Sequence, residues 1–191
     1  MDMKQPLLVM FLGVPRSGKT YFATRLAKKI GGVRLNGDAM RLAIFGSLEA
    51  IEQTYHSEHR QHVNTYTFGA IDYVVEQLLD SGVSVIYDAI HSKRAERREH
   101  EELANRYGVV PVVVVMKTPH HVALQRGQDR APTASDRQFD KDRMREAIEH
   151  FSNTMEQPEP TEHVVEINGE DSFEVQYQSF ISQVNAIMCS R

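Results

Sequence analysis

The chain has almost no cysteine and no apolar run long enough to span a membrane. Because Cys189 is the only cysteine, no disulfide can form within the chain, and neither a zinc site nor a cysteine nucleophile is indicated. The apolar run at 6–14 is far shorter than the roughly 20 residues of a membrane-spanning helix, and it lacks the basic region and cleavage site of a signal peptide. We therefore expect a cytoplasmic protein that works without a membrane.

Basic residues are too few for a general attraction to nucleic acids. The chain holds 22 Lys and Arg against 26 Asp and Glu, and its formal net charge is −4. A nucleic-acid substrate is therefore disfavoured, although a negative total leaves room for a local basic groove.

Linkers, internal repeats and low-complexity tracts are also missing. A length of 191 residues with 41% hydrophobic content suits one compact domain with a full core. We expect a single domain over 1–191.

The stretch GVPRSGKT follows the phosphate-binding pattern G-x-x-x-x-G-K-[ST]. An apolar run at 7–12 precedes it and helix-forming residues follow, so the loop joins a strand to a helix. In such a loop, backbone N–H groups and the helix N-terminus surround phosphate oxygens. Lys19 would reach the outer phosphates, and the Thr20 hydroxyl would help to hold a magnesium ion. We assign nucleotide binding to Gly13, Pro15, Arg16, Ser17, Gly18, Lys19 and Thr20.

Strands and helices alternate along the whole chain. After the first strand, the stretches VRLN, SVIYD, VVPVVVVMK and HVVEIN are typical of strands, and helical patterns separate them. This alternation predicts an α/β fold with a mainly parallel, five-stranded sheet covered on both faces. Positions 46–68 and 125–138 interrupt the alternation, and we expect helical lids there. Within 48–80 we expect two or three helices, with breaks or bends near Gly69 and the β-branched residues at 63–67.

Two aspartates follow strands and should converge with the loop. The carboxyl ends of parallel strands meet at one edge of a sheet, so Asp38 and Asp88 are expected beside the loop. Asp88 is placed like the acidic residue that supports the metal in phosphoryl-transfer enzymes, with Thr20 as its partner. Asp38, with Arg41 one helical turn later, could take a proton from an attacking hydroxyl while Arg41 steers the substrate. A helix cap or a turn is the structural alternative for both aspartates.

Arginines that close over the phosphates are expected in the stretch LQRGQDRAP. Arg126 and Arg130 lie four residues apart, on one face of a helix, and would act over the β- and γ-phosphates. A solvated arginine face is the alternative for both, and it is the favoured interpretation for Arg137. A solvated face with surface ion pairs is also favoured for the basic cluster at 93–98, over a patch for an anionic substrate or nucleic acid.

The histidines between 56 and 62 do not form a known metal-ligand pattern. Histidines spaced three residues apart point in gradually different directions around a helix, and no cysteine or carboxylate completes a set of metal ligands. They indicate a polar helix face or, for His56 and His59 together with Tyr55 and Arg60, part of an acceptor pocket. His91, just past Asp88, is a further candidate for that pocket.

Taken in order, the motifs resemble a known family. GVPRSGKT, LNGDAMRLAIFG, SVIYDAIHSKRAERRE and LQRGQDRAPTASDRQ are similar to successive blocks of the P-loop kinases related to phage polynucleotide 5′-hydroxyl kinase and zeta toxins. The match covers about 7–160 and implies a three-layer α/β/α P-loop NTPase fold that uses ATP and Mg²⁺. By position, the resemblance implies that Lys19 and Thr20 bind nucleotide and metal and that Asp38 is the base. It further implies that Arg41 orients the base or contacts the substrate. Asp88 matches the acidic residue of the third strand, and Arg130 matches the lid arginine.

The chain departs from the family pattern at two places. The family often has glycine where Arg16 stands, and the polynucleotide kinases have Asp-Thr-Asn where this chain has DAIH. The second change lies on the acceptor side. The resemblance therefore supports the reaction more than the substrate.

These residues predict a magnesium-dependent kinase that moves the γ-phosphate of ATP to a hydroxyl of a small molecule or of a nucleic-acid 5′ end. The negative net charge slightly favours the small molecule. Two rivals stay open: a P-loop ATPase or nucleotide-dependent switch that hydrolyses ATP without an acceptor, and an inactive nucleotide-binding scaffold. The pair of Asp38 and Arg41 favours the kinase, because a simple switch does not require it.

Overall fold

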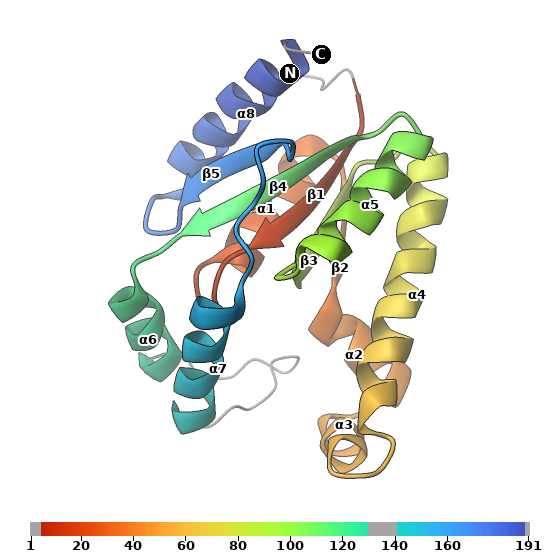
Figure 1. Ribbon diagram of the computed structural model, residues 1–191, viewed down its shortest axis with the longest axis vertical. Helices are drawn as coiled ribbons and strands as arrows, with labels where there is room; N and C mark the ends of the chain where they lie inside the picture. Colours follow the sequence, from red (N-terminus) through yellow and green to blue (C-terminus); the bar gives the residue numbers. More distant parts are fainter. Residues whose placement is uncertain (1–4, 130–140, 190–191) are drawn as a thin grey trace.

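A five-stranded parallel sheet forms the centre of the computed structural model, which describes residues 5–129 and 141–189 (Figure 1). The strands are β1 (Leu7–Leu12), β2 (Val33–Asn36), β3 (Val85–Ile90), β4 (Val110–Lys117) and β5 (Val164–Asn168). Their order is β2-β3-β1-β4-β5, and every neighbouring pair is parallel. The mainly parallel sheet expected from the alternation is confirmed. Because β1 is central, the loop that follows it lies between the ends of β3 and β4.

Helices cover both faces of the sheet and complete three layers. The first face carries α1 (Lys19–Ile30) and α8 (Phe173–Cys189), and the second carries α4 (Arg60–Asp80) and α5 (Arg94–Arg106). Each face has its own buried apolar cluster between sheet and helices. This is the three-layer α/β/α arrangement that the resemblance implied.

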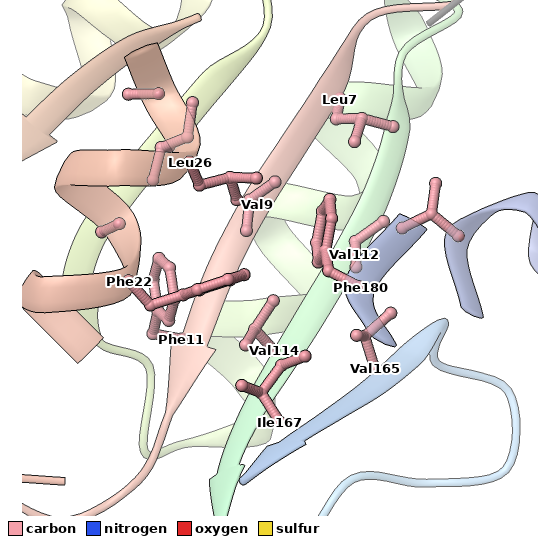
Figure 2. Packing of buried hydrophobic residues seen from close by; sticks show 14 of the residues in the cluster. Leu7, Val9, Phe11, Phe22, Leu26, Val112, Val114, Val165, Ile167 and Phe180 are labelled. Atoms are coloured by element: carbon pink, nitrogen blue, oxygen red, sulfur yellow. The ribbon is translucent and has the colours of Figure 1, made fainter. Parts of the chain in front are cut away.

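The central strand shows why the two clusters form. All six residues of β1 are buried, with Leu7, Val9 and Phe11 in one cluster and Leu8, Met10 and Leu12 in the other. Figure 2 shows the first cluster, where Phe22 and Leu26 of α1 and Phe180 of α8 meet the strands. A strand that is covered on both faces needs apolar residues at every position, which explains the unbroken run LLVMFL.

Four further helices lie beyond the carboxyl ends of the strands (Figure 1). They are α2 (Gly37–Phe45), α3 (Leu48–Tyr55), α6 (His120–Asp129) and α7 (Lys141–Thr154). The pair α6 and α7 has a small apolar cluster of its own, made of Ala123, Met144 and Ile148, against which Val14 of the loop packs. The helices that extend past the sheet therefore surround the edge where the loop and both aspartates were expected.

The expected break near Gly69 is wrong. The segment 48–80 holds two helices, and α4 runs through Gly69 and the β-branched residues without interruption over 21 residues. A glycine inside a helix costs only about 1 kcal/mol. The buried stripe of α4, at Val63, Thr67, Ile71, Val75 and Leu79, outweighs that cost. Among the described residues, neither α4 nor any other helix has the length and apolar character that crossing a membrane requires.

Arg97 contradicts the expected solvated face at 93–98. Its side chain is 0% exposed, and its guanidinium pairs with both carboxylate oxygens of Glu162, at 2.6 Å from Nε and 3.2 Å from Nη2. Arg97 also donates to the His91 carbonyl, and Glu162 accepts from the backbone N–H of Glu159. This buried pair ties α5 to the segment between α7 and β5.

Candidate active site

The phosphate-binding loop owes its shape to three residues with positive φ. Gly13 and Gly18 have φ of 150° and 102°, and Arg16 has φ of 63°. Arg16 is the only non-glycine residue in the described part of the chain with a positive φ. The left-handed region costs a side-chain-bearing residue roughly 1–2 kcal/mol, which explains why the family often has glycine there.

Lys19 is held inside the loop. Its ammonium donates to the carbonyls of Gly13 and Val14 at 2.8 and 2.7 Å, and the side chain is buried with the loop around it. Burial lowers the pKa of Lys19 to about 8, and the charge of Asp88 only partly restores it. Negative phosphate oxygens would stabilise the ammonium, so the loop favours an anion beside Lys19.

Gly169, which the sequence analysis missed, fixes the loop from the side of β5. A side-chain carbon at this position would collide with the Thr118 hydroxyl and the Ser17 carbonyl, which are themselves hydrogen-bonded at 2.8 Å. The signal for this contact is a glycine directly after the last strand, where a close backbone approach needs it. The end of β5 therefore supports the loop from outside its motif.

Arg126 lies beside the loop, as the lid interpretation expects. Its Nη2 donates to the Gly169 carbonyl at 2.9 Å, and its Nη1 lies 3.9 Å from where a Cβ of Gly18 would be. Arg130, most of the expected lid at 125–138, and Arg137 lie outside the described residues. Arg126 is thus the expected lid arginine that the structure places near the phosphate site.

Thr20 and Asp88 meet, as the metal interpretation requires. The Thr20 hydroxyl donates to Asp88 Oδ1 at 3.2 Å, and Asp88 is buried within β3, which continues past it to Ile90 instead of ending there as expected. A hydroxyl beside a carboxylate is an oxygen donor set that suits Mg²⁺. Burial raises the pKa of Asp88, opposed in part by the positive charge of Arg34.

Two partners of Asp88 come from β2 and were missed by sequence reasoning. Asn36 and Asp88 are register partners on the adjacent strands, and Asn36 Nδ2 donates to Asp88 Oδ2 at 2.9 Å. Arg34 Nε lies 3.1 Å from the same oxygen. Asn36 also accepts from the backbone N–H of Ala39 at 2.9 Å and so caps α2. One amide therefore links the expected metal ligand to the start of the helix that carries Asp38.

Replacing Asn36 by alanine should destabilise the fold by more than the loss of a helix cap. Ser47 caps α3 in the same way but makes no contact with Asp88. We expect Ser47→Ala to cost about 0.5–2 kcal/mol. Asn36→Ala should cost about 1.5–3 kcal/mol more, because it also removes a hydrogen bond to a charged group. Urea denaturation of both variants measures the difference, and equal costs would contradict the link.

Asp38 and Arg41 form an ion pair on α2, and Arg41 is the more tightly held of the two side chains. Arg41 Nη1 donates to Asp38 Oδ1 at 2.7 Å, and Nη2 donates to Asn64 Oδ1 of α4 at 3.1 Å. The guanidinium also lies over the Phe68 ring, 5.3 Å from its centroid. Arg41 is buried, whereas the Asp38 side chain is 43% exposed. Arg41 therefore holds the Asp38 carboxylate in place while it also lines the cleft.

A cleft of about 1640 Å³ joins these groups. The loop and the pair Thr20 and Asp88 line its base, α2 and α4 with Asp38 line one side, and α6 and α7 with Arg126 line the other. The expected convergence of loop, aspartates and lid arginine therefore occurs in one cavity. Its size suits a nucleotide and a second, smaller molecule side by side.

His91 does not line this cleft and forms part of a buried cluster. Its ring packs edge-on against Tyr87 and His100, with centroids at 4.6 and 5.2 Å. Its Nδ1 has no hydrogen-bond partner among the described residues. Burial, followed by the charge of His100, lowers the pKa of His91 to about 3. Burial alone would also lower the pKa of His100, but its bond to Asp72 outweighs that effect and raises it.

Acid should therefore destabilise the protein through His91 before most carboxylates titrate. The unfolded chain binds a proton at His91 below about pH 6.5, and the folded chain does not until about pH 3, so stability falls as pH falls through that interval. The expected slope is about 1.4 kcal/mol per pH unit. The pKa of His100 is raised in the folded protein, so its contribution to stability is lost only as pH rises above about 6.5 and does not add to the loss in acid.

Unfolding in urea between pH 5.0 and 6.5 tests this expectation. His91→Leu, which keeps the volume and removes the titrating group, should flatten the dependence by about that slope. An equal slope in the variant and the parent protein would contradict it.

The histidines around the start of α4 belong to a polar face. The rings of His59, His62 and Tyr66 stack along it, with centroids 5.3 and 5.2 Å apart. No group of three possible metal-ligating side chains was found within residues 5–129 and 141–189.

A family model described as an AAA domain matches residues 8–158. The chain belongs to the AAA domain family. The matched part of this AAA domain contains the loop, both aspartates and Arg126. None of the curated proteins compared with it matches its sequence.

The AAA domain shares its fold with solved kinases. A sugar kinase from Janibacter sp. HTCC2649 is 18% identical, with a TM-score of 0.67 over 94% of this chain and 95% of that one. A gluconokinase from Sinorhizobium meliloti 1021 is 16% identical, with a TM-score of 0.66 over 97% and 95%. The PezAT toxin-antitoxin system of Streptococcus pneumoniae matches at 16% identity and a TM-score of 0.55, over 67% and 55%. These likenesses confirm the P-loop fold, and the link to phage polynucleotide kinase stays a prediction.

Proposed function

We propose that this AAA domain is a kinase that transfers the γ-phosphate of ATP to a hydroxyl group. The observation that carries the proposal is the Asp38 carboxylate, held by Arg41 in the same cleft as the phosphate-binding loop. A switch or a scaffold needs the loop but has no use for a carboxylate positioned on the opposite side of the cleft. We take 1–191 as one kinase domain in the cytoplasm.

The proposed reaction is an in-line transfer in which the acceptor oxygen attacks the γ-phosphorus. Asp38 takes the proton of the attacking hydroxyl, a new phosphorus–oxygen bond forms, and the bond to the β-phosphate oxygen breaks to release ADP. Lys19, with Arg126 and Arg130 as lid arginines, stabilises the charge on the transferring oxygens. Thr20 and Asp88 would hold Mg²⁺, which supplies charge neutralisation between the phosphates.

The acceptor is a small molecule or a nucleic-acid 5′ end, and two observations support the former. The net charge of the chain is −4. In addition, two of the solved structures with this fold are named a sugar kinase and a gluconokinase.

Transfer of labelled γ-phosphate tests the proposal. Wild type, Lys19→Ala and Asp38→Asn are incubated with ATP and Mg²⁺ and with two acceptor pools, hydroxylated metabolites and 5′-hydroxyl oligonucleotides. We expect label in the metabolite pool, lost in both variants. Release of free phosphate alone, undiminished in Asp38→Asn, would overturn the kinase in favour of an ATPase or switch.

A further inference from the structure

The side of the cleft that faces away from the loop, here called the acceptor wall, is rich in carboxylates and amides. It is formed by α2, α4, the segment before α4 and the segment around the start of α5, and its polar side chains include Asp38, Glu58, Gln61, Asn64, Ser92 and Glu96. Three of these six are carboxylates. Carboxylates accept hydrogen bonds from hydroxyl groups, and amides both donate and accept.

Most basic residues around the acceptor wall are paired with carboxylates of the chain. The ion pairs are Arg34 with Asp88, Arg41 with Asp38, Lys93 with Glu156, Arg94 with Glu159, and Arg97 with Glu162. A cation that is already paired with a carboxylate attracts a second anion only weakly, because the two charges largely cancel. A ligand anion that drew the cation away would leave the carboxylate without its partner, at a cost in free energy. Arg60 is the exception: it lines the cleft and has no ion pair among the described residues, but its side chain is exposed, where a single charge contributes little.

The Asn64 side chain is held in an orientation that suits a ligand hydroxyl group. Its Oδ1 accepts from Arg41 and from the Tyr55 hydroxyl, each at 3.1 Å. These two donors fix the amide orientation, so the Nδ2 group is the donor that remains for a ligand. Asp38 Oδ1 is fixed by Arg41 in the same way, beside the site of attack.

We propose that the acceptor is an uncharged polyhydroxylated small molecule of the sugar or sugar-alcohol class. The inference rests on the proposed kinase function, because it assigns the acceptor of that reaction. Sugar acids, sugar phosphates and nucleic-acid 5′ ends are recognised best by cations that have no carboxylate partner, and among the described residues of the acceptor wall only the exposed Arg60 is such a cation. Neutral polyols need the alternating acceptors and donors that the wall presents.

Binding and transfer are measured separately, so that the acceptor class and the reaction are tested independently. Calorimetric titration with Mg²⁺ and a non-hydrolysable ATP analogue compares four matched pools: neutral aldoses and alditols, sugar acids, sugar phosphates, and 5′-hydroxyl oligothymidylate. Transfer of labelled γ-phosphate to the same pools follows. We expect a neutral compound to bind at least about tenfold tighter than its carboxylated or phosphorylated counterpart (about 1.4 kcal/mol).

The outcomes separate the two proposals. Neutral polyols that bind but receive no label would show that the wall selects neutral polyols as ligands and would overturn the kinase. Tighter binding and labelling of an acid, a phosphate or the oligonucleotide would sustain the kinase and overturn the acceptor class. Absence of binding by every neutral compound at millimolar concentration would also overturn it.

A charge reversal on the wall gives an independent readout. Glu58→Lys should strengthen the binding of a sugar acid relative to its neutral counterpart. The ratio of the two dissociation constants, acid over neutral, should fall by about two- to fivefold, the size of a single exposed ion pair. Glu99→Lys makes the same charge change on the exposed surface of α5, outside the cleft. An equal shift in both variants would show that the wall does not select by charge.

Discussion

Replacing Asp38 by asparagine should slow phosphoryl transfer by about 10²–10⁴-fold, the usual contribution of a positioned general base. Asparagine has nearly the same shape, and its oxygen can still accept the bond from Arg41, but it cannot take the proton of the acceptor. The loss should therefore fall on kcat. The KM for ATP should change little, since Asp38 lies across the cleft from the loop.

Two comparisons make the Asp38 prediction specific. Lys19→Ala should weaken ATP binding itself, because it removes the ammonium that is held inside the phosphate-binding loop. Equilibrium binding of an ATP analogue separates the two variants. An unchanged kcat in Asp38→Asn, with a carboxylate no longer available, would show that Asp38 is only a residue of the first turn of α2.

Breaking the buried ion pair should have the largest effect on stability. Arg97→Ala leaves the Glu162 carboxylate buried, where it is 1% exposed, with no positive partner. We expect a loss of about 3–5 kcal/mol of unfolding free energy, a large share of the roughly 5–15 kcal/mol of an ordinary domain. Urea denaturation followed by circular dichroism measures it.

The same helix provides a matched control. Arg98 pairs with Glu102 at 2.9 Å, but both side chains are well exposed, and Arg98→Ala should cost less than about 1 kcal/mol. The double variant Arg97→Met with Glu162→Leu should recover much of the loss, because no charge is then left without a partner. Similar costs for Arg97→Ala and Arg98→Ala would contradict the role of burial.

What the sequence could predict follows from how local each signal is. The loop is defined by eight consecutive residues, and its flanking strand and helix are visible beside it. Asp38 and Asp88 were located because parallel strands bring their carboxyl ends to one edge, a rule that needs no knowledge of distances. The pattern of this one sequence was enough to predict the sheet and the meeting of the loop, Asp38 and Asp88 in one cleft.

The remaining site residues depend on contacts between distant segments. Asn36 is significant only because β2 pairs with β3 in the register that sets it opposite Asp88. Arg97 looked like a surface residue, since its neighbours are charged and its partner Glu162 lies 65 positions away. Gly169 carries no motif, and its role appears only when β5 approaches the loop. Such contacts require the tertiary arrangement.

The separate apolar cluster of α6 and α7 has an evolutionary consequence. These two helices pack mainly on each other, through Ala123, Met144 and Ile148, rather than within either cluster of the sheet. A part with its own small core can be lengthened, shortened or replaced at little cost to the folding of the rest. The side of the cleft formed by α6 and α7 can therefore change between relatives faster than the sheet does, and exchanging this helical pair is a practical route to altering that side while the two clusters of the sheet stay intact.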